Sequence, residues 1–217
     1  MGENDIKKQL SSVAAIFPLP IYKTNIVREF TKEEQDELDV IISEQLTEFY
    51  GEESIRTKNI SIDRYLLNRK SFLSIHSFIQ HHLKEFVTTV LGIDLRKTNW
   101  SPHITMSWLS AYETNHFETF HQHPNSIISG VFYINCLKNL AHGKSDGILF
   151  ACPSHNMLQI LGVVEEVIVE DTKFSDKPYH LSTVGGDLII FPSTVHHCVN
   201  LNETPDQTRI SLAFNVI

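Results

Sequence analysis

The sequence predicts an α+β fold, with two helices in its first part and a jelly-roll unit of antiparallel strands in the rest. Apolar residues recur at helical spacing between residues 31 and 91. After Trp100 the chain changes to short runs of β-branched and aromatic residues, separated by Gly, Pro, Asn and Asp. Because 41% of the 217 residues are apolar and 20% are charged, we expect a single domain, residues 1–217, with a full hydrophobic core.

The part before the strands holds an extended entry and two helices. Prolines alternate in the run Phe17–Tyr22 (FPLPIY), which forbids a helix and favours an edge strand or an extended segment. A capping box that starts at Thr31, followed by apolar residues at helical spacing, predicts a helix over about 31–49. The polar stretch 51–70 predicts irregular structure. A second helix is expected over 69–91.

Eight short runs predict the strands. In chain order they are Ile104–Ala111, Ile127–Ile134, Ile148–Phe150, Met157–Leu161, Val163–Val169, Asp187–Phe191, His196–Asn200 and Thr208–Val216. We expect residues 96–217 to form the jelly-roll core. Residues 1–95, with the extended segment and the two helices, are expected to pack on one face of it.

Charge and cysteine content exclude several classes of protein. Eighteen Lys and Arg against 26 Asp and Glu give a formal net charge of −8, which argues against a nucleic-acid partner. Cys136, Cys152 and Cys198 are an odd number without metal-like spacing, so we expect reduced thiols in the cytoplasm. The N-terminus lacks the apolar stretch of a signal peptide, and no apolar run reaches the roughly 18 residues of a spanning helix. We therefore expect a cytoplasmic protein without a membrane partner, and the sequence leaves a homodimer open.

Histidines supply the candidate metal site. His121 and His123 lie two apart, so both side chains point to the same side of an extended chain. A buried strand over 187–192 leads into His196 and His197. A histidine pair on one strand and a distant histidine on a neighbouring strand can form a three-point metal site with open coordination positions. The alternative is that these are ordinary surface or core histidines.

A basic residue follows on the last predicted strand. Arg209 and Ser211 share one face of that strand. A guanidinium buried in a barrel requires a carboxylate partner, and a bound dicarboxylate would supply one. The alternative is an ion pair with Asp206 or Glu203 at the surface. Asp146 lies in a long connection over the mouth of the barrel, where substrate contacts often occur.

Several of these segments together resemble one known family. They are Ser107–Tyr112 (SWLSAY), His121–Ser126 (HQHPNS), Ser129–Tyr133 (SGVFY), Gly186–Ser193 (GDLIIFPS), His197 and Arg209–Asn215 (RISLAFN). This set is similar to the 2-oxoglutarate- and Fe(II)-dependent oxygenases that are distantly related to prolyl hydroxylases. The likeness covers roughly residues 100–217. It implies a double-stranded β-helix, which is a cupin-like jelly roll, with iron at its mouth.

The resemblance implies roles for individual residues. His121 would be the first iron ligand, and His197, not His196, would be the distal one. Arg209 would hold the far carboxylate of 2-oxoglutarate. The residues expected to support it there are Ser211, Tyr133 and, as a further candidate, Tyr112.

The sequence departs from the family at the third ligand. The family's Asp or Glu is missing, because His123 stands two residues after His121. We expect His123 to be the third ligand. A second arrangement has two histidines and waters, with Asn125 as a weak oxygen ligand. A third uses the pair His116 and Glu118, although a regular strand would turn these two side chains away from the others.

The resemblance implies a 2-oxoglutarate- and Fe(II)-dependent dioxygenase that hydroxylates an amino-acid or protein side chain and releases succinate and CO2. Its cofactors would be Fe(II), 2-oxoglutarate and O2, with ascorbate as an optional reductant, and its partner a small-molecule or peptidyl substrate. We expect no catalytic side chain beyond the metal centre. The alternatives are a cupin-like three-histidine metalloenzyme that does not use 2-oxoglutarate, and a jelly-roll binding module without catalysis.

Overall fold

The chain folds into two β-sheets and two α-helices over the residues that the computed structural model describes, which are 18–50, 56–137, 146–151 and 178–217. The helices are α1 (Lys32–Glu44) and α2 (Leu73–Glu85), and α2 continues into a π-helical turn, Phe86–Val90. The strands are β1 (Tyr22–Asn25), β2 (Leu46–Tyr50), β3 (Arg56–Ser61), β4 (Ile104–Tyr112), β5 (Glu118–His121), β6 (Ile128–Tyr133), β7 (Gly147–Phe150), β8 (Tyr179–Ser182), β9 (Asp187–Pro192), β10 (His197–Val199) and β11 (Arg209–Val216). None of the helices in this part of the chain has the length and apolar character needed to span a membrane.

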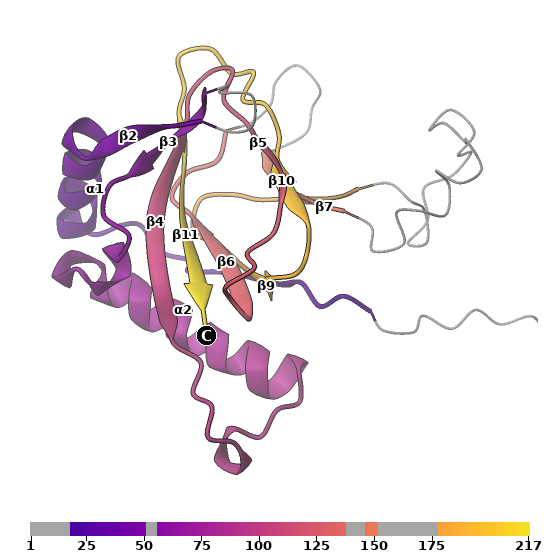
Figure 1. Ribbon diagram of the computed structural model, residues 1–217. Helices are drawn as coiled ribbons and strands as arrows, with labels where there is room; N and C mark the ends of the chain where they lie inside the picture. The colour runs from indigo at the N-terminus through magenta and orange to yellow at the C-terminus, as the bar shows by residue number, and fades with distance from the viewer. Residues whose placement is uncertain (1–17, 51–55, 138–145, 152–177) are drawn as a thin grey trace, which may run out of the picture.

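The strands form one sheet of seven and one of four (Figure 1). The order in the larger sheet is β1-β9-β6-β11-β4-β3-β2, the order in the smaller sheet is β5-β10-β7-β8, and all neighbours are antiparallel. Apolar side chains of the two sheets meet between them. They are Tyr133, Ile189 and Phe191 from the larger sheet and Ile148 and Phe150 from the smaller. This is the two-sheet arrangement of antiparallel strands that the sequence predicts.

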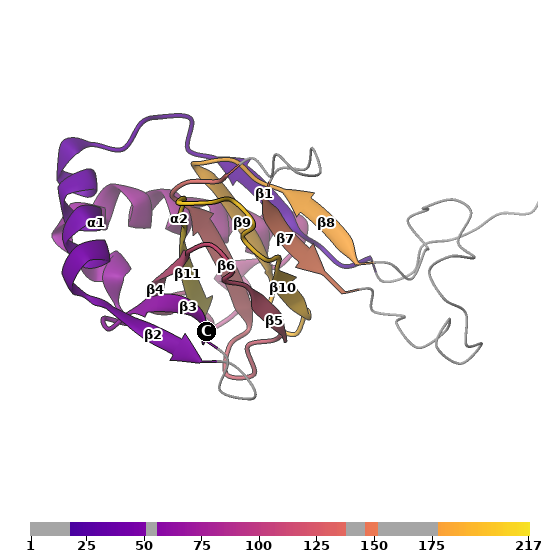
Figure 2. The same cartoon turned by 90° about the horizontal axis from the view of Figure 1, so that it is seen from above.

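A second apolar cluster lies between the helices and the other face of the larger sheet. Ile75, Ile79 and Leu83 are spaced by four residues along α2 and are completely buried. They share this cluster with Leu212 and Phe214 of β11. Figure 2 shows α1 and α2 on the side of the larger sheet that faces away from β5 and β10.

The first helix is shorter than predicted. It begins at the expected capping box, in which Thr31 and Glu34 each bond the other's backbone N–H. It ends at Glu44 and not near residue 49, and Leu46–Tyr50 form β2 instead. The prediction that the next segment is irregular is also wrong, because that segment contains β3, the partner of β2. The apolar spacing of LTEFY fits either structure, but Thr, Phe and Tyr suit a pleated strand, and pairing with β3 decides the outcome.

Two short strands, β5 and β8, were not predicted. Each has four residues, and each forms by pairing with a neighbouring strand, β5 with β10 and β8 with β7. β1 begins at Tyr22 and is an edge strand of the larger sheet, as expected after the proline run. The strands predicted at Met157–Leu161 and Val163–Val169 lie outside the described residues.

Strand register decides which side chains face the space between the sheets. Arg209 lies opposite Tyr112, and Ser211 lies opposite Tyr133. Because alternate residues of a strand point to the same side, these four side chains share the face that looks toward the smaller sheet. The intervening Leu212 points to the helices and joins their cluster. β11 therefore carries a polar row on one face and an apolar row on the other.

Replacing Leu83 with Ala should lower the free energy of unfolding by about 2–5 kcal/mol, because a completely buried side chain of α2 would leave a cavity. The same substitution at Leu73, which is 52% exposed at the start of the same helix, should cost less than about 0.5 kcal/mol. Urea unfolding of the two variants measures the difference. Equal effects would contradict the packing of α2 against the sheet.

Candidate active site

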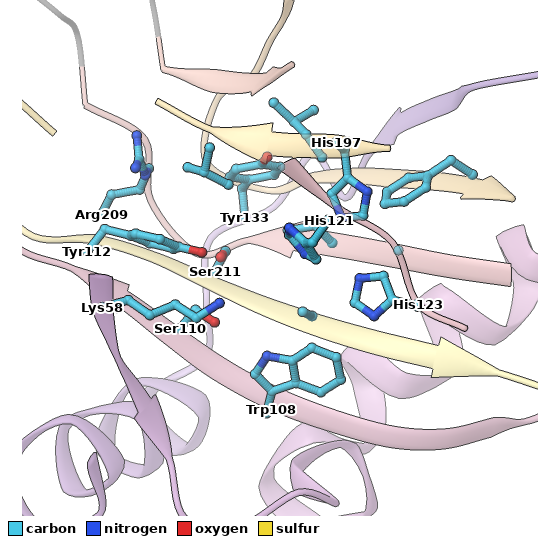
Figure 3. A pocket seen from close by; sticks show the side chains of 16 residues that line it. Lys58, Trp108, Ser110, Tyr112, His121, His123, Tyr133, His197, Arg209 and Ser211 are labelled. Carbon is cyan, nitrogen blue, oxygen red and sulfur yellow. The ribbon is translucent and has the colours of Figure 1, made fainter. Parts of the chain in front are cut away.

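Three histidine side chains meet at one end of the space between the sheets (Figure 3). His197 on β10 lies directly opposite His121 on β5, and their ring centroids are 4.3 Å apart. His123 follows β5, where its backbone N–H bonds the carbonyl oxygen of Ser193 at 3.0 Å. Its ring stacks on that of His197 at a centroid distance of 5.2 Å and an angle of 11°. One ring nitrogen of each histidine lies within 4.8 Å of the others, so the structure brings together the three histidines singled out from the sequence.

Backbone carbonyls orient two of these rings. Nδ1 of His121 lies 2.9 Å from the oxygen of Thr119, and Nδ1 of His197 lies 2.9 Å from the oxygen of Val195. A carbonyl oxygen only accepts hydrogen bonds, so Nδ1 carries the proton in both rings and Nε2 is left with its lone pair. Hydrogen bonds of this kind fix the orientation and the tautomer of metal-binding histidines.

The three imidazoles are neutral at pH 7. Burial lowers the pKa of His123 to about 4 and that of His197 to about 3, and it also lowers the pKa of His121. Repulsion from the Lys58 ammonium contributes to each shift. The neutral imidazole is the form that binds a metal ion.

Arg209 lies at the other end of the same cavity (Figure 3). Its side chain is 1% exposed, and its Nη1 and Nη2 donate to Oδ1 of Asp146 at 3.0 Å and to the carbonyl oxygen of Asn200 at 2.9 Å. Its Nε is buried and has no hydrogen-bond partner among the residues that the structure describes. The surface ion pair with Asp206 or Glu203 that the sequence left open is therefore wrong, since the partner is Asp146 and the pair is buried.

Hydroxyl groups border the cavity between its two ends. Tyr112, Tyr133 and Ser211 line the cavity that holds the histidines and Arg209. The guanidinium carbon of Arg209 lies 4.8 Å from the centre of the Tyr112 ring. Burial raises the pKa of Tyr112 to about 12 and also raises the pKa of Tyr133. Both phenols stay protonated, and the Tyr112 hydroxyl donates to Oε2 of Glu118 at 3.5 Å.

A buried ion pair that the sequence did not indicate lies beside the cavity. Lys58 on β3 lines the cavity and contacts Glu118 on β5, and both side chains are 9% exposed. Burial lowers the pKa of Lys58, whereas the touching carboxylate favours the charged ammonium, so we treat the pair as ionised. No sequence signal singled out Lys58, because it lies in the polar segment that was expected to be irregular.

The other candidates for a third ligand lie elsewhere. Glu118 is held by its lysine, and His116 accepts at Nδ1 a hydrogen bond of 3.1 Å from the backbone N–H of Glu113. Asn125 is exposed in a turn. His123 is the candidate that groups with the other two histidines in the described part of the chain.

A second group of ligand-type side chains lies on α2. It consists of His81, His82 and Glu85. The hydroxyl of Tyr22 lies 2.7 Å from Nδ1 of His82 and 2.8 Å from Oε2 of Glu85, so these polar groups already bond one another. We assign no metal role to this group.

The cavity suits a divalent metal and a dicarboxylate. Three unprotonated ring nitrogens are a fitting donor set for Fe(II) and leave coordination positions open. At the other end, the unpartnered Nε of Arg209 offers a charge-assisted hydrogen bond to a carboxylate. Val131, Phe191 and Ala213 add apolar lining, which limits the access of water.

The free energy of unfolding of the metal-free protein should fall as the pH drops below about 6.5, the ordinary histidine value. The unfolded chain takes up protons near that pH, whereas the lowered pKa values of His123 (about 4) and His197 (about 3) delay protonation of the folded protein. Protons therefore favour unfolding over the window from about 6.5 down to about 3. Urea unfolding at pH 7 and pH 5 measures the loss, which should be smaller in His197→Gln. A variant with an unchanged pH dependence would contradict this account.

The sequence matches the family described as "Putative 2OG-Fe(II) oxygenase" over residues 106–215, about half of the chain. The matched region includes the three clustered histidines and Arg209. A comparison with curated proteins gives no match.

Solved structures agree in fold. SnoN, an α-ketoglutarate-dependent epimerase from nogalamycin biosynthesis, is 9% identical and superimposes with a TM-score of 0.60 over 92% of this chain and 78% of its own. A Pseudomonas putida prolyl-4-hydroxylase is 13% identical, with a TM-score of 0.53 over 91% and 92% of the two chains. HygX from Streptomyces hygroscopicus, solved with nickel and 2-oxoglutarate, is 9% identical, with a TM-score of 0.53 over 91% and 82%.

These structures confirm the predicted jelly roll, and at such low identity the likeness concerns the fold alone. The assignment of the chemistry rests on the family match, because the matched residues include the strands that place the histidines and the arginine around one cavity. The chain belongs to the 2-oxoglutarate- and Fe(II)-dependent oxygenases, enzymes that use Fe(II), 2-oxoglutarate and O2.

Proposed function

We propose that this oxygenase holds Fe(II) through His121, His123 and His197 and hydroxylates an amino-acid or protein side chain. One observation carries the proposal. Three unprotonated imidazoles and a buried arginine with a free N–H border a single cavity. The imidazoles would take one face of the metal and leave the other positions for cosubstrate and O2.

The metal and the cosubstrate would supply the oxidation, with 2-oxoglutarate converted to succinate and CO2 as O2 is consumed. The residues of the chain hold these groups in place. The bonds from Nδ1 of His121 and His197 to backbone carbonyls aim each Nε2 into the cavity. The apolar side chains of Val131 and Phe191 restrict water around the metal.

We place the far carboxylate of 2-oxoglutarate at the Arg209 end. Its Nε is a buried donor without a partner, and an unmade hydrogen bond there costs free energy that a carboxylate would recover. Ser211 and Tyr133 face each other across β11 and β6 and would add hydroxyl donors. Tyr112, which lies against the guanidinium, is a further contact. Such charge-assisted bonds in a buried site are among the stronger ones in proteins.

The substrate side is supported by analogy of fold. A prolyl-4-hydroxylase is among the similar structures, which favours hydroxylation of an amino-acid or peptidyl substrate. An epimerase with the same fold is also similar, so the fold admits another oxidative outcome. We further propose that the protein acts in the cytoplasm on a small-molecule or peptidyl substrate, without a nucleic-acid or membrane partner. The net charge of −8 and the free thiols of Cys136 and Cys198 support this.

Replacing His197 with Ala should weaken metal binding by more than about 100-fold, because even changes outside the ligand set cost about 10–100-fold. His196→Ala is the matched control. His196 is the neighbouring residue but is exposed and stands outside the histidine cluster, so its loss should leave metal affinity unchanged. Titration with Co(II), followed by the absorbance of the bound ion, measures both variants. Similar losses in the two would remove His197 from the ligand set.

Replacing Arg209 with Ala should weaken 2-oxoglutarate binding by at least about tenfold, the loss of one charge-assisted hydrogen bond. Arg96→Ala changes an arginine that is 90% exposed and should have no effect. Calorimetric titration of the Ni(II)-loaded protein measures binding. Succinate formation with Fe(II) and ascorbate then tests turnover. If Arg209→Ala retains full affinity, the cosubstrate is held elsewhere, and if the wild type neither binds 2-oxoglutarate nor forms succinate, the proposed function fails.

A further inference from the structure

Arg209 does not act as a free cation, because Asp146 already neutralises it. The two side chains are 1% and 9% exposed and lie 3.0 Å apart, from Nη1 to Oδ1. Asp146 is itself held in place. Its Oδ2 accepts the backbone N–H of Leu137 at 2.7 Å, and its carbonyl oxygen accepts the backbone N–H of Thr183 at 2.9 Å. A buried carboxylate fixed in this way cancels the charge of Arg209 inside the protein.

The other charged residue in the cavity wall is neutralised too. Among the lining residues that the structure describes, Lys58 and Arg209 are the charged ones, and each contacts its own carboxylate, Glu118 or Asp146. The histidines contribute no charge in their neutral form. The formal charges of these described lining residues and their two ion-pair partners therefore sum to zero.

The position of the carboxylate differs from the arrangement that is usual for non-haem iron. Where two histidines and one carboxylate bind the metal, the carboxylate cancels one of the two positive charges of the ion. Three neutral imidazoles leave that charge in place. Here the carboxylate stands at the opposite end of the cavity, beside Arg209. In this cavity the carboxylate that a facial triad would place on the metal is replaced by His123, and a carboxylate pairs with Arg209 instead.

We propose that Asp146 is the electrostatic replacement for the missing metal carboxylate, and that it sets the affinity of the cavity for a dianionic cosubstrate by neutralising Arg209. Asp146 is thus a positioning residue that acts through the arginine. The inference rests on the proposed function. A metal ion held by the three histidines would keep its full charge for the dianion, and Nε of Arg209 with the nearby hydroxyls would bind the far carboxylate without a net positive charge.

The test is a double-mutant cycle on cosubstrate binding. Asp146→Asn removes the negative charge and keeps the shape and one oxygen acceptor for Arg209, although its NH2 group cannot accept the Leu137 N–H that Oδ2 accepts. His123→Asp would restore a carboxylate at the metal. Each variant is saturated with Ni(II), which is checked separately, and titrated with 2-oxoglutarate in a calorimeter. Asp63→Asn is the matched control, since Asp63 forms an ion pair with Arg69 at 2.8 Å, outside the cavity lining.

We expect Asp146→Asn to bind 2-oxoglutarate at least about threefold more tightly, since it removes one negative charge from the cavity, and His123→Asp at least about threefold more weakly, since it adds one. The double variant should return to within about twofold of the wild type. If Asp146 merely holds Arg209 in place, Asp146→Asn weakens binding and the double variant is weaker than either single one, which overturns the proposal. A wild type that binds Ni(II) but no 2-oxoglutarate contradicts the proposed function instead.

If Asp146→Asn does not fold, a second pair of variants tests the same proposal. Arg209→Gln leaves Asp146 unpaired and should lose affinity. Adding Asp146→Asn to it gives a neutral buried pair, which proteins often tolerate. The proposal requires the second change to recover at least about threefold of the lost affinity. No recovery in a folded protein overturns it.

Discussion

The antiparallel pairing of β5 with β10 is the constraint on which the site depends. It sets His121 and His197 directly opposite each other, although the sequence separates them by the whole of β6, β7, β8 and β9. The same rule of alternation turns Arg209 and Ser211 of β11 into the cavity and Leu212 toward the helices. A shift of one residue in the pairing of β11 would turn its polar side chains toward the helices and its apolar side chains into the cavity, and a shift in the pairing of β5 with β10 would separate His121 from His197.

Burial gives these polar groups their properties. Desolvation keeps the imidazoles neutral and the phenols protonated, so the cavity offers lone pairs at one end and donors at the other. The same desolvation would be costly for lone charges, and Lys58 and Arg209 each contact a carboxylate as a result. Within the paired Arg209 side chain, Nε is a buried N–H that has no hydrogen-bond partner among the described residues. In the described part of the cavity, this buried donor without a hydrogen-bond partner is one that a bound anion would satisfy.

Site residues could be predicted from the sequence where the pattern that identifies them lies within a few residues. Spacing on a strand fixes the direction of His121 and His123 and of Arg209 and Ser211. The choice of His197 over His196, and the candidates Tyr112 and Tyr133, came from the resemblance to the oxygenase family. Lys58 could not be found, since β3, the polar strand next to the edge strand β2, has no hydrophobic alternation to reveal it. The sequence analysis placed Asp146 in a connection where substrate contacts often occur. Its ion pair with Arg209 joins residues far apart in the sequence, and no local pattern predicts such a pair.

The sequence by itself determined the division into helices first and mostly strands after, the face of α2 that is buried, and the residue types able to bind metal and a dicarboxylate. These follow from periodicity and side-chain chemistry, which act within a few residues. Tertiary structure alone decided where α1 ends and β2 begins, that His123 joins the cluster while Glu118 pairs with Lys58, and that Asp146 neutralises Arg209. The physical reason is that strand pairing and charge pairing are contacts between distant segments, and their free energy exists only once the chain has folded.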